Sequence, residues 1–561
     1  MKTILLPVFL FLLPGLSALG ANWTGRTAAL SGPAAAGSRI AWDYNSLREI
    51  APVGDYPRMC RISGDTVSVV YENGYGSTVI RYSSDEGRSW SDPDTLFRGF
   101  TVRNGRDSAF VWVSNPELIR LADGVLLAAC NYRPQKPGIY PFGIAVRRST
   151  DAGTTWSPPQ TIYRAGKSFS DGCWEPSFLQ LPNGDVHVYF SNEGVFTESD
   201  EQDIEVLISH DGGVSWEPEP RQVCFRDGKR DGMPVACLVG DEIVVSVEDN
   251  RIGEFKPSVV RNPVNGCWRS PVLADSPLRE PALREPLHDT VYAGAPYIIT
   301  LPGGETALSY QTTRGRTKEW ELSTMEVAVG DREGRNFTNV TRPFDIPTDR
   351  LAKWNSIMVF DRDRIAALSG CNYSGGRVGV WMILGYIIPE LTIFRSGIRA
   401  DGEVSAAEWG GKLPVFIGHR GPSNLRAGIC RDGRDLCFVA CVSESVKGKC
   451  RVNFYLSAGE EAYKVETFRN GTAAVFRRDG KTWRQMPGDG VEHGAGDRGD
   501  RYGIEVKVPL RLLKISRGTS LRINCGLVAP DSAGGCYEEL IANSAEDDPA
   551  TWCRVADGPD L

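Results

Sequence analysis

The chain has 561 residues, more than one ordinary hydrophobic core accommodates, so we expect at least two domains. Its composition is globular, with 41% hydrophobic and 24% charged residues. The formal net charge of −7 excludes the strongly basic balance typical of proteins that bind nucleic acids or anionic membranes. A neutral polymer such as a glycan is compatible with this charge.

The first 20 residues have the pattern of a secretory signal peptide. Lys2 provides the positive start, Ile4 to Leu13 form a short apolar run, and Ala18-Leu19-Gly20 is a small-residue cleavage pattern. The run is too short to span a bilayer, and no cysteine follows it that could carry a lipid. We therefore expect a secreted or periplasmic monomer without a membrane anchor.

The next part of the chain is built from six repeats of one hairpin pattern. Each unit has a residue followed by Pro, an apolar strand, a turn, a second apolar strand and a polar ending. The repeats are marked by Pro57, Pro116, Pro176, Pro234, Pro296 and, at the same place in the sixth, Ser356, at intervals of 59, 60, 58, 62 and 60 residues. Six units of about four strands predict a six-bladed β-propeller over residues 40–390. We expect the segment Ile40 to Ile50 to supply the outer strand of the last blade.

A second motif lies between the hairpins, Ser83-x-Asp85-x-Gly87-x-Ser89-Trp90, and recurs at Ser149–Trp156 and Ser209–Trp216. It resembles the Asp-box, or BNR repeat, of sialidase-like propellers. Asp accepts backbone N–H bonds in a tight turn, Gly allows positive φ, and Trp packs between blades. Because the motif occurs three times, we interpret it as scaffold rather than as a catalytic site.

In each hairpin the start of the first strand and the end of the second lie at the same end. Two carboxylates occupy such positions in adjacent units: Glu175, between Trp174 and Pro176, and Glu248, after the aliphatic run Ile243 to Val247. Glycoside hydrolysis requires two carboxyl groups across one pocket, so we predict that Glu175 and Glu248 are catalytic. The other candidates for binding the sugar are Arg58, Asp171, Trp174, Glu193, Arg230, Asp249 and Arg251.

The segment Gly172 to Asp249, with Trp174-Glu175-Pro176, Arg230 to Val235 and Glu248, is similar to the paired catalytic segments of exo-α-L-arabinanases. The resemblance implies a retaining hydrolase of a neutral plant-type glycan, with Glu175 as nucleophile and Glu248 as acid/base. Retention requires the two carboxyl groups to lie about 5–5.5 Å apart. The order of the two roles stays open, since sequence cannot show which pKa is raised.

After Pro389 the repeat stops, and residues 396–561 are expected to form a β-sandwich. Their opening, Ile398 to Glu403 with Glu408-Trp409, resembles family-nine-like carbohydrate-binding modules. Sugar binding by this part stays open.

Two other functions also stay open: an exo-α-sialidase, which would need three arginines around the pocket, with Tyr373 as a nucleophile, and a non-catalytic glycan-binding propeller. We expect no cofactor and no metal, because the five His are scattered and paired CxxC motifs are missing. Most of the 14 Cys are expected to be free, although Cys430, Cys437, Cys441 and Cys450 are close enough in sequence for a disulfide.

Overall fold

The computed structural model describes residues 37–498, 501–515, 519–531 and 533–556. The predicted signal peptide lies outside these residues. Within them the chain forms forty strands and a single four-residue α-helix, α1 (Ala406–Trp409), so the protein is all-β. Five short 3-10 helices complete the secondary structure: η1 (Tyr44–Ser46), η2 (Phe169–Asp171), η3 (Val264–Gly266), η4 (Trp320–Leu322) and η5 (Pro549–Thr551). No helix of the described residues is long and apolar enough to cross a membrane.

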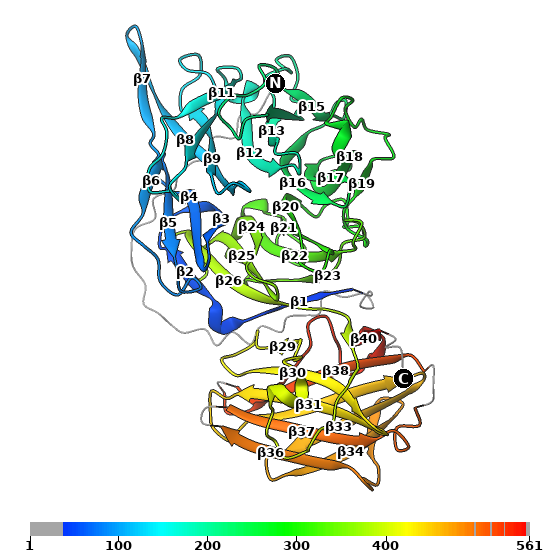
Figure 1. Cartoon of the computed structure of the whole chain (residues 1–561). Coiled ribbons are helices and arrows are strands. Elements are labelled where there is room, and N and C mark those ends of the chain that lie inside the picture. Colours follow the sequence, from blue (N-terminus) through cyan, green and yellow to red (C-terminus); the bar gives the residue numbers. More distant parts are fainter. Residues whose placement is uncertain (1–36, 499–500, 516–518, 532, 557–561) are drawn as a thin grey trace.

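The first part of the chain forms six antiparallel sheets, which we number 1 to 6 in chain order (Figure 1). Sheets 1 to 3 contain β3 (Asp55–Ser63), β4 (Thr66–Glu72), β5 (Thr78–Ser83) and β6 (Asp94–Phe97); β7 (Phe100–Asn104), β8 (Asp107–Arg120), β9 (Leu126–Pro134), β10 (Gly143–Ser149) and β11 (Gln160–Arg164); and β12 (Cys173–Gln180), β13 (Val186–Asn192), β14 (Asp203–Ser209) and β15 (Arg221–Cys224).

Sheets 4 to 6 contain β16 (Asp231–Val239), β17 (Glu242–Asp249), β18 (Lys256–Pro263) and β19 (Arg279–Pro281); β20 (Ala293–Thr300), β21 (Thr306–Thr312), β22 (Thr324–Gly330) and β23 (Thr338–Thr341); and β24 (Ala352–Val359), β25 (Arg364–Cys371) and β26 (Gly379–Ile388) with β1 (Arg39–Trp42) and β2 (Arg48–Ala51).

The six sheets are arranged in a closed ring. The inner strands β3, β8, β12, β16, β20 and β24 each contact the inner strand of the next sheet, and β24 contacts β3. Apolar clusters fill the spaces between neighbouring sheets, so each sheet buries both faces. Convergence of the inner strands brings their ends around one axis, which is the arrangement that the candidate site requires.

The outer edge of sheet 6 is completed by the start of the described chain. β1 pairs with the far end of β26, through Arg39↔Ile388 to Trp42↔Gly385, and β2 pairs with Met382 to Val380. The expectation that the segment from Ile40 to Ile50 supplies this strand is confirmed. Pairing residues about 340 positions apart covers an edge that would otherwise expose unpaired N–H and C=O groups.

Each inner strand contains a β-bulge at the same place. One residue per strand has positive φ, namely Tyr56 (54°), Asn115 (49°), Glu175 (50°), Met233 (51°), Ala295 (50°) and Trp354 (51°). At each bulge two residues face one residue of the second strand, as shown by the register shift between Trp174 and Ser177 opposite Ser191 and Tyr189. The left-handed conformation costs each non-glycine residue about 1–3 kcal/mol, so its sixfold recurrence marks a built-in feature of the ring.

The sixth bulge corrects the predicted register of the repeat. Trp354 has the positive φ, and the pairing shifts between Lys353 and Ser356, so Asn355 takes the place of the proline. The sequence alignment with Ser356 at that place was wrong by one residue. The error arose because this unit lacks the proline that marks the bulge in the other five.

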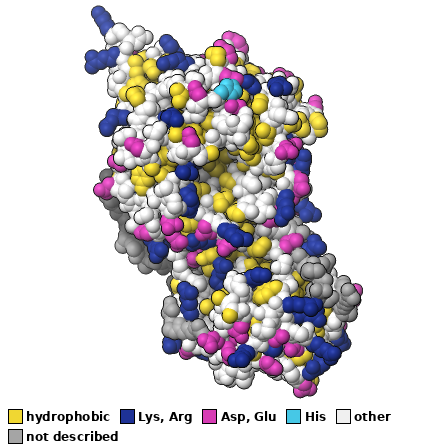
Figure 2. Space-filling model, viewed as in Figure 1, with side chains coloured by type: hydrophobic (Ala, Val, Ile, Leu, Met, Phe, Trp, Pro, Cys, Tyr) yellow, Lys and Arg dark blue, Asp and Glu magenta, His cyan; other side chains and the backbone are white. Residues whose placement is uncertain are grey.

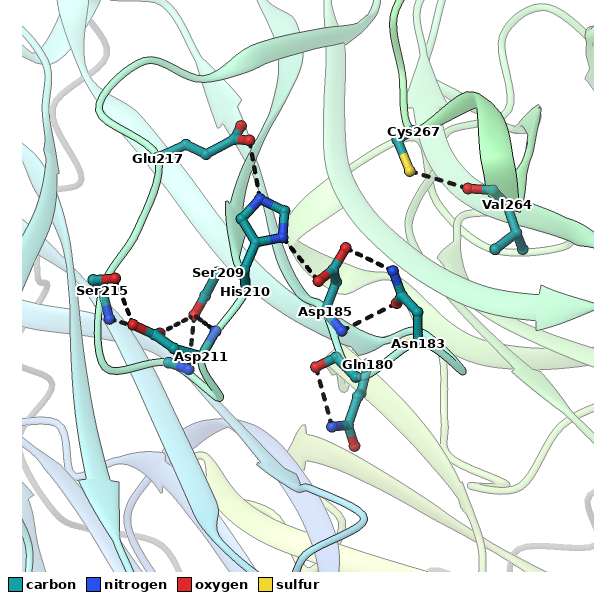
Figure 3. A network of polar contacts seen from close by, with 12 residues as sticks. Gln180, Asn183, Asp185, Ser209, His210, Asp211, Ser215, Glu217, Val264 and Cys267 are labelled. Carbon is teal, nitrogen blue, oxygen red and sulfur yellow. Dashed lines mark hydrogen bonds and ion pairs between the residues drawn. The ribbon is translucent and has the colours of Figure 1, made fainter.

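The three Asp-containing motifs form tight turns at the opposite end of the sheets from the bulges. In the third, the Oδ1 atom of Asp211 accepts the N–H of Ser215 at 2.8 Å and Ser209 donates to the same carboxylate at 2.8 Å. His210, in the same turn, bonds to Asp185 and Glu217 (Figure 3). The hydrogen bonds from Ser215, first, and from Ser209 lower the pKa of Asp211 to about 2. Their place supports the interpretation of the motif as scaffold.

The rest of the chain forms two further sheets around one apolar core. The larger sheet contains β27 (Leu391–Thr392), β40 (Cys553–Ala556), β38 (Leu521–Pro530), β32 (Arg451–Ala458), β33 (Glu461–Phe468), β34 (Thr472–Asp479) and β35 (Thr482–Gln485), with β39 (Cys536–Leu540) paired to β38. The smaller contains β28 (Phe394–Arg395), β30 (Asn424–Asp432), β31 (Asp435–Ser443), β37 (Arg501–Pro509) and β36 (Glu492–Arg498), with β29 (Val415–Ile417) paired to β30.

The second part packs directly on sheet 6. Tyr386 of β26 stacks on Phe416 of β29 with ring centroids 4.2 Å apart, and Arg39 of β1 donates to Ser544 at 2.8 Å. β27 already pairs with β40, so the change of domain falls between Ile388 and Leu391, earlier than residue 396. All 14 cysteines lie in described segments, and Cys430 and its cross-strand partner Cys437 are free thiols.

Candidate active site

Four carboxyl groups lie on the first or second strand of a sheet at the end that contains the bulges, and we call them the axial carboxyls: Asp55, Glu72, Glu175 and Glu248. All four are half-buried, whereas the neutral residues at matching strand ends, Asn131, Ser191 and Gln311, are fully buried. The surface is hollowed near the centre of the ring (Figure 2). The axial carboxyls are therefore the acidic groups placed to meet a ligand at the axis.

Glu175 is itself a bulge residue, with φ of 50°. In a regular strand its side chain would alternate with those of its neighbours, and the bulge re-aims it at the axis. The hydroxyl of Ser191, on the paired strand β13, donates to Oε2 of Glu175 at 2.9 Å. The other carboxylate oxygen is left to face a ligand.

Glu248 lies at the end of β17, opposite Gly232 of β16. Its Oε2 atom accepts the backbone N–H of Ala295, the bulge residue of sheet 5, at 2.8 Å. Two glycines leave the space that this carboxyl occupies: a Cβ at Gly294 would lie 2.5 Å from Oε2, and one at Gly232 would lie 3.0 Å from Oε1. The carboxyl is thus fixed from sheet 4 and from sheet 5.

The two glutamates interact electrostatically. Burial, and then the negative charge of Glu248, raise the pKa of Glu175 to about 8, and the Ser191 hydroxyl acts in the opposite direction. Burial also raises the pKa of Glu248, while the Ala295 N–H and Arg230 lower it. Burial and the charge of Glu248 therefore favour a proton on Glu175, whereas the Ala295 N–H and Arg230 favour the ionised form of Glu248. A pair that is half protonated has the acid and the carboxylate that glycoside hydrolysis needs.

Three of the predicted sugar-binding residues instead form a chain beside Glu175. The Trp174 indole donates to Glu193 at 3.1 Å, and Arg230 donates to the same oxygen of Glu193. Trp174 is only 6% exposed, with its ring packed between Phe142 and Phe169. The indole therefore lacks an open face for a sugar, and Phe169, 61% exposed, presents the accessible ring.

Arg58 and Asp171 also have their polar groups occupied. Arg58 is 3% exposed and donates to the carbonyls of Pro57, Trp354 and Asn355, with Glu117 at 3.5 Å. Asp171 accepts the Ser168 and Ser170 hydroxyls within its own turn. These contacts favour structural roles for both residues.

Asp249 and Arg251 point away from the pair. Asp249 is 3% exposed; it accepts from Arg226 at 2.9 Å and from the backbone N–H of Arg251 at 2.7 Å. The Arg251 side chain is exposed on the following loop. Tyr373, considered as a sialidase-type nucleophile, packs against Trp381 at 5.1 Å.

Sequence reasoning did not single out several groups that touch the axial carboxyls. Ser191 holds Glu175, and Tyr292 lies beside Glu248, since the Cβ position of Gly294 is 2.4 Å from the tyrosine hydroxyl and 2.5 Å from Oε2. Asp55 and Glu72 form a second acidic pair on sheet 1. Glu72 occupies in sheet 1 the position that Glu248 occupies in sheet 4. Aligning the hairpin repeats would therefore have identified Glu72 as a candidate site residue. In the described residues, no group of three His, Cys, Asp or Glu side chains is placed to hold a metal ion.

No protein-family model matches the chain, and its sequence has no match among curated proteins. Similar solved structures include arabinanases and sialidases. The Penicillium chrysogenum α-L-arabinanase complexed with arabinobiose is 16% identical, with 62% of this chain and 97% of that chain aligned at a TM-score of 0.42.

The α-L-arabinofuranosidase of Fusarium graminearum with arabinobiose has the same identity and coverage at a TM-score of 0.43. The Trypanosoma rangeli sialidase is 11% identical, with 87% of this chain and 89% of that chain aligned at 0.40. Because these TM-scores lie below 0.5, we take nothing about this chain's chemistry from the neighbours.

Proposed function

We propose that the chain is a secreted or periplasmic glycoside hydrolase that cleaves a neutral plant-type glycan with retention, in the manner of exo-α-L-arabinanases. The ring of six sheets would be its catalytic six-bladed β-propeller, and the two-sheet part a β-sandwich similar to carbohydrate-binding modules. One observation carries the proposal: Glu175 and Glu248 are half-buried, electrostatically coupled carboxyls on adjacent sheets, each held through one oxygen.

The reaction proceeds in two displacements. One carboxylate attacks the anomeric carbon while the other carboxylic acid gives its proton to the departing glycosidic oxygen, which breaks the C–O bond and leaves a glycosyl ester. The second residue, now ionised, takes a proton from water, and the water oxygen replaces the ester to release the sugar. The pair can supply both required states at once: burial and the charge of Glu248 favour the protonated form of Glu175, while the Ala295 N–H and Arg230 favour the ionised form of Glu248.

The assignment of the two roles differs between the resemblance and the unliganded structure. The resemblance makes Glu175 the nucleophile, which must be ionised. In the unliganded protein, the N–H of Ala295 favours the ionised form of Glu248 instead. The resemblance order therefore requires the proton to move from Glu175 to Glu248 when the substrate binds.

A sialidase is less well supported by the contacts. Recognition of a sialic acid carboxylate requires arginines with free donors facing the pocket. Arg58 is bonded to carbonyls, Arg230 to Glu193, and Arg251 lies on an exposed loop. The four axial groups are carboxyls and offer an anionic sugar no positive charge. A purely binding function would leave the coupling of Glu175 and Glu248 without a use.

Hydrolysis of a panel of aryl glycosides, linear arabinan, other neutral plant polysaccharides and a sialoside tests the function. We expect cleavage of a neutral substrate, and NMR of the first-formed product should show the starting anomeric configuration. Glu175→Gln and Glu248→Gln should each lower turnover by about 10²-fold or more. In Glu175→Ala and Glu248→Ala, azide should restore activity by forming a glycosyl azide, and the variant whose glycosyl azide has inverted configuration is the one that lacks the nucleophile. An inverted first product or full activity in both variants would refute the mechanism.

A further inference from the structure

A group of aromatic and charged side chains lies across the ring from the glutamate pair. Trp320 belongs to η4 of sheet 5, Lys353 and Trp354 to β24 of sheet 6, and Asp55 to β3 of sheet 1; we call these four residues the aromatic wall. In a closed ring of six, sheets 6 and 1 lie opposite sheets 3 and 4, which carry Glu175 and Glu248. The loop that contains η4 follows β21, so it emerges at the same end as the axial carboxyls.

Trp320 is a large aromatic side chain held at the surface. It is 42% exposed, yet its ring lies 6.1 Å from Tyr292 and 6.2 Å from Trp354. The ammonium of Lys353 lies over the Trp320 ring, 4.5 Å from its centroid, and forms an ion pair with Glu321. These contacts immobilise the indole before any ligand arrives, which removes an ordering cost from binding.

Tyr292 connects this wall with the catalytic pair. Its hydroxyl accepts a hydrogen bond from Gln311 at 3.0 Å. The hydroxyl also lies next to Glu248, because both groups are within 2.5 Å of the point where a Cβ on Gly294 would be. The row Glu248, Tyr292, Trp320 therefore runs from the proposed scission point to an open aromatic ring. A sugar attached to the one being cleaved would extend along this row.

Asp55 supplies the polar edge of the wall. Its Oδ1 accepts the N–H of Tyr56 at 2.9 Å, and a Cβ at Gly370 would lie 1.8 Å from that oxygen, so the glycine is required for this placement. Burial and the neighbouring Glu72 raise the pKa of Asp55, while Lys353 lowers it. Its Oδ2 oxygen is available as an acceptor for sugar hydroxyls.

We infer that the aromatic wall is a subsite for a second, neutral sugar ring of the substrate, with Trp320 as the stacking platform and Asp55 as the hydroxyl acceptor. The C–H face of a sugar packs on an aromatic ring, and a few polar groups at the edge fix its orientation. Glu321 neutralises Lys353, and the remaining polar groups, Asp55 and Glu72, are carboxyls, so these residues disfavour a uronic or sialic acid. The inference deepens the proposed function and rests on it.

Calorimetry with arabinotriose, galactotriose, 3′-sialyllactose and trigalacturonic acid on the full-length Glu248→Gln variant measures binding apart from cleavage. We expect a neutral trisaccharide to bind and neither acidic one to bind comparably. Adding Trp320→Ala should weaken binding by about tenfold, and Trp320→Phe by less, because it keeps an aromatic face. In the otherwise wild-type enzyme, Trp320→Ala should raise KM for the trisaccharide more than it raises KM for an aryl monoglycoside, which does not reach the second subsite.

Two controls separate the subsite from a general loss of structure. Tyr44→Ala removes a side chain of similar exposure, 40%, on the outer part of sheet 6, and should not change binding. Asp55→Asn should bind more tightly than Asp55→Ala, because the amide restores an acceptor. Thermal unfolding must show that every variant is folded.

The outcomes distinguish the subsite from the function. Unchanged trisaccharide affinity in Trp320→Ala, with hydrolysis intact, would overturn the subsite and leave the hydrolase standing. Loss of affinity in Trp320→Ala in a chain that cleaves none of the panel would support the subsite and refute the hydrolase. Preferred binding of an acidic trisaccharide would overturn the stated substrate class.

Discussion

The carboxylate of Glu248 accepts the backbone N–H of Ala295 at 2.8 Å across the boundary between sheets 4 and 5. Three other boundaries have an equivalent hydrogen bond, from Asn115 to Glu72 at 2.9 Å, from Met233 to Ser191 at 3.0 Å and from Trp354 to Gln311 at 2.7 Å. In each case a bulge leaves the N–H outside the ladder of its own sheet. Glu248 therefore links two sheets with one oxygen and is available for chemistry with the other.

This double role predicts different effects of two substitutions at Glu248. Glu248→Gln keeps an oxygen acceptor for Ala295, so it should abolish turnover with little change in stability. Glu248→Ala should also lower the free energy of unfolding by about 1–3 kcal/mol, because a buried N–H loses its partner. Gln311→Ala, which removes the matching link at the next boundary, is the control for stability. Equal melting temperatures for the two Glu248 variants would contradict the linking role.

The glycines beside Glu248 predict a steric test. A Cβ at Gly294 would lie 2.5 Å from Oε2 of Glu248 and 2.4 Å from the Tyr292 hydroxyl, so Gly294→Ala must displace one of them. We expect kcat to fall by at least tenfold while the circular dichroism spectrum is retained. Gly303→Ala in the β20–β21 turn of the same sheet meets no atom within 4 Å and should behave as wild type. Full activity of Gly294→Ala would show that this placement of the carboxyl is unnecessary.

Glu175 predicts a pH-dependent gain in stability when its charge is removed. The pKa is about 8 in the folded protein and about 4.5 in the unfolded chain. A raised pKa contributes stability below pH 4.5, and this contribution is lost as the pH rises through 8. Glu175→Gln should therefore melt close to wild type at pH 5 and several degrees above it at pH 9. The exposed Glu333→Gln is the control, and a constant difference at both pH values would contradict the raised pKa.

Substitutions in the Asp-containing turns are predicted to lower stability without changing activity. Asp211 holds its turn through bonds from Ser209 and Ser215 (Figure 3). The turn follows β14, at the end of the sheet opposite the bulges and the axial carboxyls. Asp211→Ala should lower the melting temperature, and kcat measured well below that temperature should stay unchanged. Asp211→Asn, which keeps one acceptor, should be intermediate. A large fall in kcat for the folded variant would show that the turn takes part in the reaction.

Sequence reasoning was most successful where the chain repeats itself. Hairpins about sixty residues apart predicted six successive sheets, and the apolar segment from Ile40 predicted the closing strand, because pairing requires only alternating apolar residues and an open edge. The same reasoning placed Glu175 and Glu248 at one end of neighbouring hairpins. It failed at Trp354, where the marker proline is missing.

The amino-acid sequence by itself determined the all-β class, the six successive sheets of the first part and the position of Glu175 and Glu248 at one end of adjacent hairpins, since strand periodicity and turn residues are local properties. The tertiary structure alone decided which side chains have free polar groups. Trp174 and Arg58 have the right chemistry for a sugar, but packing and carbonyl contacts occupy them. Trp320 instead stays 42% exposed, and Asp55 uses one carboxyl oxygen to accept the N–H of Tyr56. Burial and partner choice depend on residues hundreds of positions away, which no local pattern encodes.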